Sequence, residues 1–150
     1  MPAYKGRLSL TQINDLAAYV IAADGLTIPT EGPVAAGAEL SAKFGCESCH
    51  GVAGSGGLPN PRSFTGTIPG WTGPDFLELV KDEEEFDQWV KLGRSERMRE
   101  NRAASFFLDR AGVKMPAFGH ALGPQETEEL WAFVGWLRSS QGPRTGRAEN

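Results

Sequence analysis

Two cysteines and a histidine lie within five positions of one another in this chain of 150 residues, and their spacing carries the clearest chemical signal. Cys46, Cys49 and His50 form the pattern C-x-x-C-H. Two thiols three residues apart at the end of a helix can reach the two vinyl groups on one edge of a porphyrin, and the next residue places an imidazole under the iron. The pattern is therefore typical of covalent attachment of one c-type haem through Cys46 and Cys49, with His50 as an axial ligand.

A second axial ligand is expected from a methionine, because a thioether is the usual companion of histidine in cytochromes c, where it raises the reduction potential. Met115, followed by Pro-Ala-Phe-Gly, is the candidate. Met98 lies in a run of charged residues and is predicted to be exposed, and His120 is predicted to be a surface residue. The predicted ligands of the iron are thus His50 and Met115.

Cys46 and Cys49 also allow other chemistry: a disulfide, a redox-active C-x-x-C pair, or half of a zinc site completed by His50 and His120. A thioredoxin-like pair follows a strand, and no strand pattern precedes Cys46. A zinc site would need ligation from the adjacent Cys49 and His50, and from a second histidine 70 positions away (120 − 50). A zinc or disulfide binding module is the less favoured alternative.

Charge and hydropathy exclude several classes of partner. The chain has 15 Lys and Arg against 19 Asp and Glu, a net charge of -4, which argues against nucleic acid as its main partner. No apolar run approaches the roughly eighteen residues of a membrane-spanning helix. The first residues lack the pattern of a signal peptide, so an export signal is expected upstream or already removed.

Helical periodicity dominates the chain and predicts an all-α fold. A capping box formed by Ser9 and Gln12 marks the start of the first helix, and residues 51–73, rich in glycine and proline, are predicted to be a loop. Leu77 is predicted to face the core with its helix neighbours Phe76 and Val80. The predicted helices are Ser9 to about Asp24, about 34–45, one from Pro74, Glu83 to Leu92, 99–111, and one from Pro124.

The chain resembles the class I c-type cytochromes of bacteria over residues 33–140. The resemblance is carried by 37–40 (Gly-Ala-Glu-Leu), 45–51 around the C-x-x-C-H pattern, 115–119 (Met-Pro-Ala-Phe-Gly) and the closing helix 128–137. It implies a helical cytochrome c-like fold around one covalently attached haem. It further implies that the first and last helices of this domain cross beside the haem.

Particular contacts follow from the same resemblance. It implies that Gly37 packs against Phe133 or Trp131, and that the carbonyl of Pro59 or Pro61 accepts a hydrogen bond from the ring of His50. Trp71 is expected either to meet a haem propionate or to pack in the core. The sequence departs from the family at Ser41, where many relatives have an aromatic residue, and in an additional segment, 94–113, before Met115.

An internal repeat suggests more than one unit. A shift of 114 positions (115 − 1) places Met1-Pro2-Ala3-Tyr4 on Met115-Pro116-Ala117-Phe118, and Leu16 and Val20 on Leu130 and Val134. We therefore divide the chain into residues 1–32, an N-terminal extension that resembles the end of a preceding cytochrome c domain, a cytochrome c domain at 33–140, and a disordered tail at 141–150. The apolar stripe within residues 1–24 predicts association with another haem domain or a homodimer.

The resemblance implies one-electron transfer by a low-spin haem, redox proteins as partners, and a periplasmic or otherwise extracytoplasmic location. Because His50 and Met115 would fill both axial positions, we expect an electron carrier and not an enzyme. The alternative is a fragment or subunit of a dihaem or multihaem cytochrome that serves a periplasmic oxidoreductase. The basic stretch 94–114 is interpreted as a solvated face in preference to a docking surface for an acidic partner.

Overall fold

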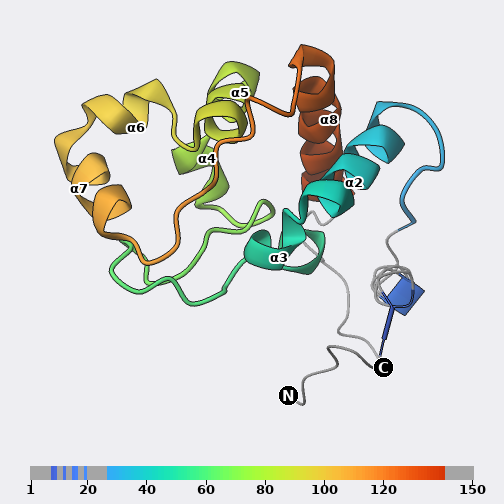
Figure 1. The fold of residues 1–150 in the computed structure, drawn as a ribbon, viewed down its shortest axis with the longest axis horizontal. Helices are drawn as coiled ribbons and strands as arrows, with labels where there is room; N and C mark the ends of the chain where they lie inside the picture. The colour runs from blue at the N-terminus through green and yellow to red at the C-terminus, as the bar shows by residue number, and fades with distance from the viewer. Residues whose placement is uncertain (1–7, 10–11, 13–14, 17–18, 20–26, 141–150) are drawn as a thin grey trace, which may run out of the picture.

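The computed structural model describes residues 8–9, 12, 15–16, 19 and 27–140 of the chain. Helices dominate these residues (Figure 1), which contain no β-strand; an isolated antiparallel β-bridge links Pro59 and Thr67. The predicted all-α fold is confirmed. The elements are α2 (Pro33–Phe44), α3 (Glu47–His50), the 3-10 turn η1 (Val52–Gly54), α4 (Phe76–Leu79), α5 (Glu83–Leu92), α6 (Glu96–Glu100), α7 (Arg102–Arg110) and α8 (Pro124–Ser140).

The predicted capping box near the N-terminus is present. The backbone N–H of Ser9 donates to the side chain of Gln12 at 2.9 Å, and the backbone N–H of Gln12 donates to the hydroxyl of Ser9 at 3.2 Å. These reciprocal bonds satisfy two of the N–H groups that the start of a helix leaves unpaired. The rest of the repeat, including Met1, the expected helix end near Asp24 and the tail 141–150, lies outside the described residues.

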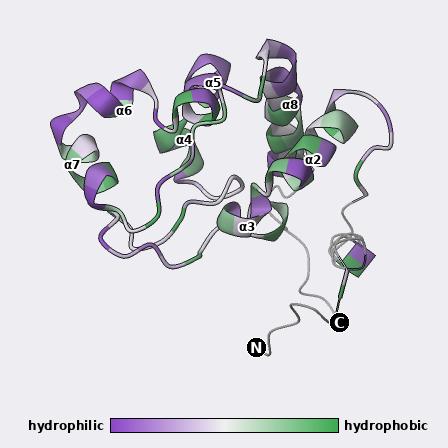
Figure 2. Ribbon diagram, viewed as in Figure 1, coloured by the Kyte–Doolittle hydropathy of each residue, from purple (hydrophilic) through white to green (hydrophobic). Residues whose placement is uncertain are grey.

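Helices α2 and α8 cross and pack against each other on the side of the domain opposite α6 and α7 (Figure 1). Gly37 of α2 is buried at the crossing, where a side chain would meet the backbone of Glu129 and, at 2.8 Å, the Cβ of Phe133. Phe133 and Leu137 are each 1 % exposed. Beyond this crossing the N-terminal end of α8 is hydrophilic, whereas its following turns are hydrophobic (Figure 2). The implied contact between Gly37 and Phe133 is confirmed, because only a residue without a side chain lets the two backbones approach so closely.

Trp131 packs elsewhere. Its ring lies 5.2 Å from that of Phe86 and 6.4 Å from that of Phe76, which joins α8 to α5 and α4. Helix α5 has the predicted bounds because Asp82 accepts a hydrogen bond from the N–H of Glu85 at its start and Gly93 adopts a left-handed conformation at its end. The orientation predicted for Leu77 is wrong: it is 51 % exposed. Helix α4 is a single turn: Phe76 and the following Val80 are buried, and Leu79 packs against the core from the same turn.

The predicted single helix over 99–111 is wrong, because Asn101 divides the segment into α6 and α7. Asn101 has an extended backbone, and its side-chain oxygen accepts hydrogen bonds from the N–H groups of Ala103 and Ala104, which caps α7. The exposure predicted for Met98 is also wrong: it is 8 % exposed. Ser95 caps α6, so that this helix begins before the predicted position and turns Met98 inward among otherwise charged neighbours.

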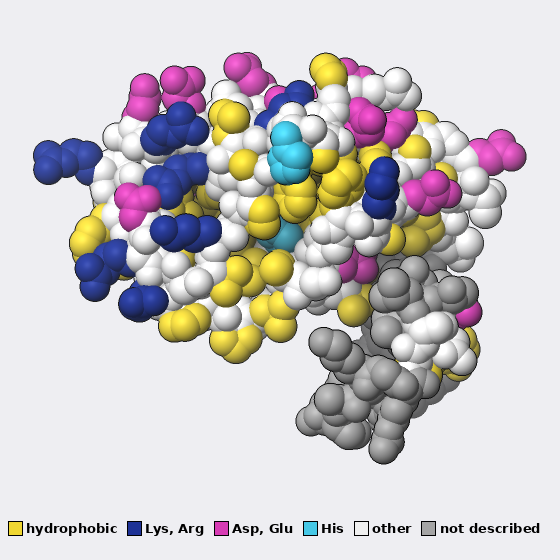
Figure 3. All heavy atoms as spheres, viewed as in Figure 1, with side chains coloured by type: hydrophobic (Ala, Val, Ile, Leu, Met, Phe, Trp, Pro, Cys, Tyr) yellow, Lys and Arg dark blue, Asp and Glu magenta, His cyan; other side chains and the backbone are white. Residues whose placement is uncertain are grey.

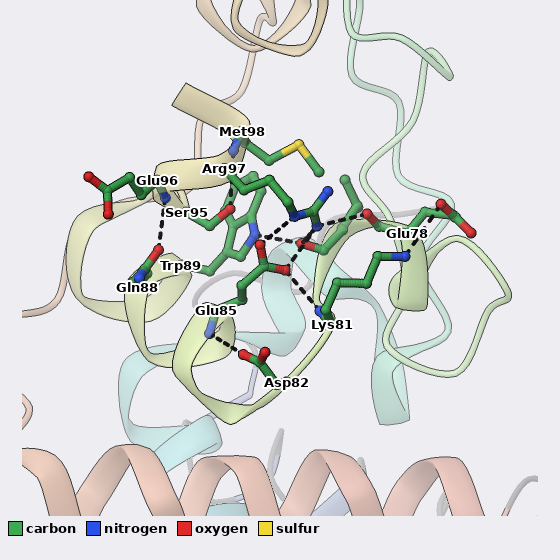
Figure 4. Close-up of polar contacts among 11 residues, drawn as sticks. Glu78, Lys81, Asp82, Glu85, Gln88, Trp89, Ser95, Glu96, Arg97 and Met98 are labelled. Atoms are coloured by element: carbon green, nitrogen blue, oxygen red, sulfur yellow. Dashed lines mark hydrogen bonds and ion pairs between the residues drawn. The ribbon is translucent and has the colours of Figure 1, made fainter. Parts of the chain in front are cut away.

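A polar network fastens α6 to α4 and α5 (Figure 4). The guanidinium of Arg97 donates to both carboxylate oxygens of Glu85 and, at 3.1 Å, to the carbonyl of Glu78. The indole N–H of Trp89 donates to the carbonyl of Leu79 at 2.9 Å. The hydrogen bond from Arg97 holds the pKa of the Glu85 carboxyl below its ordinary value. The additional segment is thus an ordered part of the domain and not a loose insertion.

Replacing Glu85 by Gln is expected to lower the free energy of unfolding by about 1 kcal/mol at neutral pH, the upper range for a partly exposed ion pair. Since the folded-state pKa of Glu85 is depressed, its contribution is present above the ordinary carboxyl pKa and is lost as pH falls through the lowered value. Urea denaturation at neutral and at strongly acidic pH measures the difference. The exposed Glu84, replaced by Gln, is the matched control; an equal loss in both variants, or a loss independent of pH, would contradict the assigned role of Glu85.

Candidate functional site

The residues of the C-x-x-C-H pattern lie on one turn that follows α2 directly. Gly45, with a left-handed backbone, ends α2, and the N–H of Cys46 donates to the carbonyl of Ser41 at 3.0 Å. The N–H of His50 then donates to the carbonyl of Cys46 at 3.0 Å, which closes α3. Cys46 and Cys49 are free thiols and half-buried. The two thiols and the imidazole therefore lie on one turn of the chain, as their spacing predicted.

A carbonyl orients the ring of His50, but it belongs to Pro69 and not to Pro59 or Pro61, so the implied choice between those two prolines is wrong. The Nδ1 of His50 lies 2.9 Å from the oxygen of Pro69. Because a carbonyl can only accept, Nδ1 carries the proton and Nε2 is the basic nitrogen. A hydrogen bond of this kind fixes the tautomer and the direction of a metal-binding histidine.

Close backbone contacts bring Pro69 to this position. The N–H of Trp71 donates to the carbonyl of Gly54 at 2.8 Å, and a Cβ at Gly70 would lie 2.6 Å from the same carbonyl. The chain after α3 therefore turns back on itself where glycines allow it, and Pro69 arrives beside His50. Pro59 and Pro61 lie farther out in the loop, in the hairpin that the Pro59–Thr67 bridge closes.

Trp71 covers the ring of His50. The two rings are stacked, with centroids 5.2 Å apart and an interplanar angle of 29°, and Trp71 also meets Phe133 edge to face at 6.3 Å. Its carbonyl accepts a hydrogen bond from Arg138 of α8. Trp71 is buried, so the packing role anticipated for it is confirmed, while its expected contact with a propionate stays a prediction.

Burial changes the protonation of the site residues in opposite directions. It lowers the pKa of His50, against the smaller effect of the Pro69 carbonyl, and so favours the neutral imidazole. It raises the pKa of the Cys46 thiol. A neutral imidazole with a free basic nitrogen is the form that binds a metal.

Met115 reaches the site from the far end of the domain on a loop over 112–119. The N–H of Phe118 donates to the carbonyl of Val90 at 2.9 Å, and the N–H of Gly119 donates to that of Lys91 at 3.1 Å, which fastens the loop to the end of α5. Met115 is half-buried and packs against the same hydrophobic cluster as Cys46. The ring of Phe118 lies 5.6 Å from that of Phe44, at the end of α2.

The surface between these segments is hollowed. Figure 3 shows hydrophobic side chains gathered around a depression in the middle of this face, and both histidines of the chain are visible there, one at the surface and one deeper. His120 is exposed, as predicted. Among the described residues no group of three or more His, Cys, Asp or Glu side chains is arranged to hold a metal ion.

Lys and Arg side chains gather over α6 and α7 on the same view (Figure 3). Two of them form ion pairs, Arg94 with Asp109 at 2.6 Å and Arg97 with Glu85 at 2.5 Å. Arg99, Arg102 and Lys114 are exposed. The interpretation of this stretch as a solvated face stays a prediction.

The residues at the site fit a covalently bound haem. They supply two free thiols on one turn, an imidazole whose tautomer is fixed by a carbonyl, and a half-buried thioether on an anchored loop, all beside apolar side chains. An all-α domain with this arrangement is a c-type cytochrome domain, a haem-containing module of electron transport with redox proteins as partners. Comparison with protein families matches residues 32–134 to the family Cytochrome C oxidase, cbb3-type, subunit III, and the chain belongs to this family.

No curated protein and no solved structure matches the chain significantly. The family confirms the predicted resemblance to c-type cytochromes and the haem as cofactor. Domains of this kind are typically extracytoplasmic. None of the described helices is long and apolar enough to cross a membrane.

Proposed function

We propose that the domain carries single electrons on one haem held covalently by Cys46 and Cys49, with His50 and Met115 as its axial ligands. When bound, the haem supplies an iron that accepts and releases one electron. The observation that carries the proposal is the hydrogen bond from His50 to the carbonyl of Pro69. It fixes the orientation of a neutral imidazole and leaves Nε2 free to bind iron. The half-buried Met115 on its anchored loop is the complementary thioether.

The chain contributes an ordered site beside apolar side chains. Trp71, stacked on His50, keeps the imidazole ring in one orientation. The ring of Phe118, three residues after Met115, packs edge to face against that of Phe44. Because His50 and Met115 would fill both axial positions of a bound haem, no place would be left for a substrate, and we propose an electron carrier and not an enzyme.

A ligand-access experiment tests the axial assignment. The reduced wild-type protein is expected not to bind carbon monoxide at neutral pH, because the Met115 thioether occupies the sixth position. Replacing Met115 by Ala is expected to open that position and give rapid binding, seen as a shift of the haem absorption. Replacing the other described methionine, Met98, by Leu is the control and is expected to leave the wild-type behaviour unchanged. Ready binding by the wild-type protein would contradict the assignment.

The setting of the domain is also a proposal. We propose a periplasmic location and redox proteins as partners, since electrons reach and leave such a domain by protein contact. Residues 33–140 form the haem domain in this proposal, and residues 1–32 resemble the end of a preceding one. Leu16 and Tyr19, both described, are 53 % and 71 % exposed, which leaves apolar surface for another haem domain or a second copy to cover.

The alternative is that the chain is a fragment or subunit of a dihaem or multihaem cytochrome that serves a periplasmic oxidoreductase. The match of Met1-Pro2-Ala3-Tyr4 with 115–118 favours it. The family, which is named for an oxidase subunit, is compatible with it as well. In either setting the proposed chemistry of His50 and Met115 is the same.

A further inference from the structure

One buried polar side chain lies in the loop between α3 and α4, outside the C-x-x-C-H turn. Asn60 is 6 % exposed. Its side-chain N–H donates to the carbonyl of Val113 at 3.0 Å, and its side-chain oxygen accepts from the N–H of Val113 at 2.8 Å. Beside it, the N–H of Gly112 donates to the carbonyl of Pro61 at 2.9 Å. The amide therefore holds both backbone groups of one residue in a distant segment.

The backbone of Asn60 is itself fixed. Its N–H donates to the carbonyl of Gly66 at 2.8 Å, and its carbonyl accepts from the hydroxyl of Ser63 at 2.8 Å. The hairpin closed by the Pro59–Thr67 bridge surrounds it. The side-chain amide of Asn60 is therefore held in a fixed position relative to the hairpin.

Val113 lies two residues before Met115, a chain distance of at most about 7 Å. The other side of the Met115 loop is fastened to the end of α5 through Phe118 and Gly119. The side chain of Asn60 fastens the beginning of this loop through its two hydrogen bonds to Val113. In Figure 1 the segment after α7 runs beside the loop that follows α3, which is where this anchor lies.

The same loop that carries Asn60 ends at Pro69, the acceptor for the ring of His50. One continuous segment, 51–70, therefore contacts the His50 ring at one point and the Met115 loop at another. We propose that Asn60 is a positioning residue that sets the Met115 loop against the segment orienting His50, and so holds the thioether at the iron. This inference rests on the proposed ligation by Met115.

Imidazole binding to the oxidised protein tests the proposal. Imidazole competes with the Met115 sulfur, so its apparent affinity rises with the fraction of molecules in which the loop is open. Replacing Asn60 by Ala removes two hydrogen bonds to the backbone of Val113. We expect imidazole to bind about ten- to a hundredfold more tightly, as two ordinary hydrogen bonds imply. The readout is loss of the near-infrared sulfur-to-iron charge-transfer band during titration.

Two further variants keep the test decisive. Asn60→Asp retains an acceptor for the N–H of Val113 and is expected to shift in the same direction if the alanine variant does not fold. Thr65→Ala removes a hydrogen bond within the same hairpin, from its hydroxyl to the carbonyl of Thr67, without touching Val113, and is expected to bind imidazole like the wild type. Equal tightening in Thr65→Ala would show general loosening of the hairpin and overturn the proposal.

The outcomes separate this inference from the proposed function. If the wild type shows the sulfur band, Met115→Ala abolishes it and the Asn60 variants bind imidazole like the wild type, Met115 is the ligand and the role of Asn60 is refuted. If the wild type lacks the band, the ligation by Met115 fails, and the role of Asn60 fails with it. Tighter binding in the Asn60 variants, with Thr65→Ala unchanged, supports both.

Discussion

Replacing Gly37 by Leu is expected to destabilise the domain by about 3 kcal/mol or more, because overpacking a tight contact forces the backbones apart. A Cβ at this position would already lie 2.8 Å from the Cβ of Phe133 and closer still to the carbonyl of Glu129. Neither neighbour can yield, since the first is 1 % exposed and the second is helix backbone. Guanidinium denaturation of the haem-loaded protein, followed by circular dichroism, measures the loss.

Gly135 provides the matched control on the same pair of helices. It lies on the exposed side of α8, and a Cβ there would have no atom within 4 Å. Replacing Gly135 by Ala is expected to stabilise the protein by about 0.5–1 kcal/mol through a smaller loss of backbone entropy. A Gly37→Leu variant as stable as the wild type would contradict the close crossing of α2 and α8.

The local features of this fold are the ones that the sequence predicts well. The bounds of α5 follow from two residues: the side chain of Asp82 caps its start, and the left-handed backbone of Gly93 ends it. The start at Ser9 follows from a capping box that needs only three residues of spacing. The pattern at 46–50 is likewise local, because its three functional side chains share one turn.

The errors arise where the helical periodicity conceals a capping residue, and where a contact with another helix decides which way a side chain faces. Met98 lies among charged residues, yet the cap at Ser95 and the bond from Arg97 to Glu85 turn it inward. The periodicity over 99–111 ignores Asn101, whose side chain competes for the N–H groups of the next helix. Composition alone cannot show either effect.

The partners of the site residues were the least predictable. The loop after α3 contains three prolines that the sequence does not distinguish as partners of His50. Pro69 is the partner because the close approach of Gly54 and Gly70 brings its carbonyl beside the imidazole ring. Asn60 contacts Val113 from 53 positions away, and its type does not distinguish it from a turn residue. The sequence signal for the folding back of this loop is its glycines, since Gly54 and Gly70 stand where a Cβ would collide with the neighbouring backbone or side chain.

The second large effect is expected at the cysteines. Replacing both Cys46 and Cys49 by Ala removes the two thiols that would form thioether bonds to the porphyrin, and the variant is expected to carry no covalently bound haem. His50 and Met115 remain in this variant, so any haem it retains would be held by axial ligation alone and would be released by acidified organic solvent. Replacing the exposed His120 by Ala is the control and is expected to leave the covalent haem in place.

An alkaline pyridine haemochrome spectrum, scaled to protein concentration, tests the central claim most directly. The protein is purified from a host that has haem-attachment machinery. We predict the spectrum of one c-type haem per chain for the wild type and none for the double cysteine variant. A colourless wild-type protein, or the same haem content in the double variant, would contradict attachment at Cys46 and Cys49 and, with it, the proposed transfer of electrons.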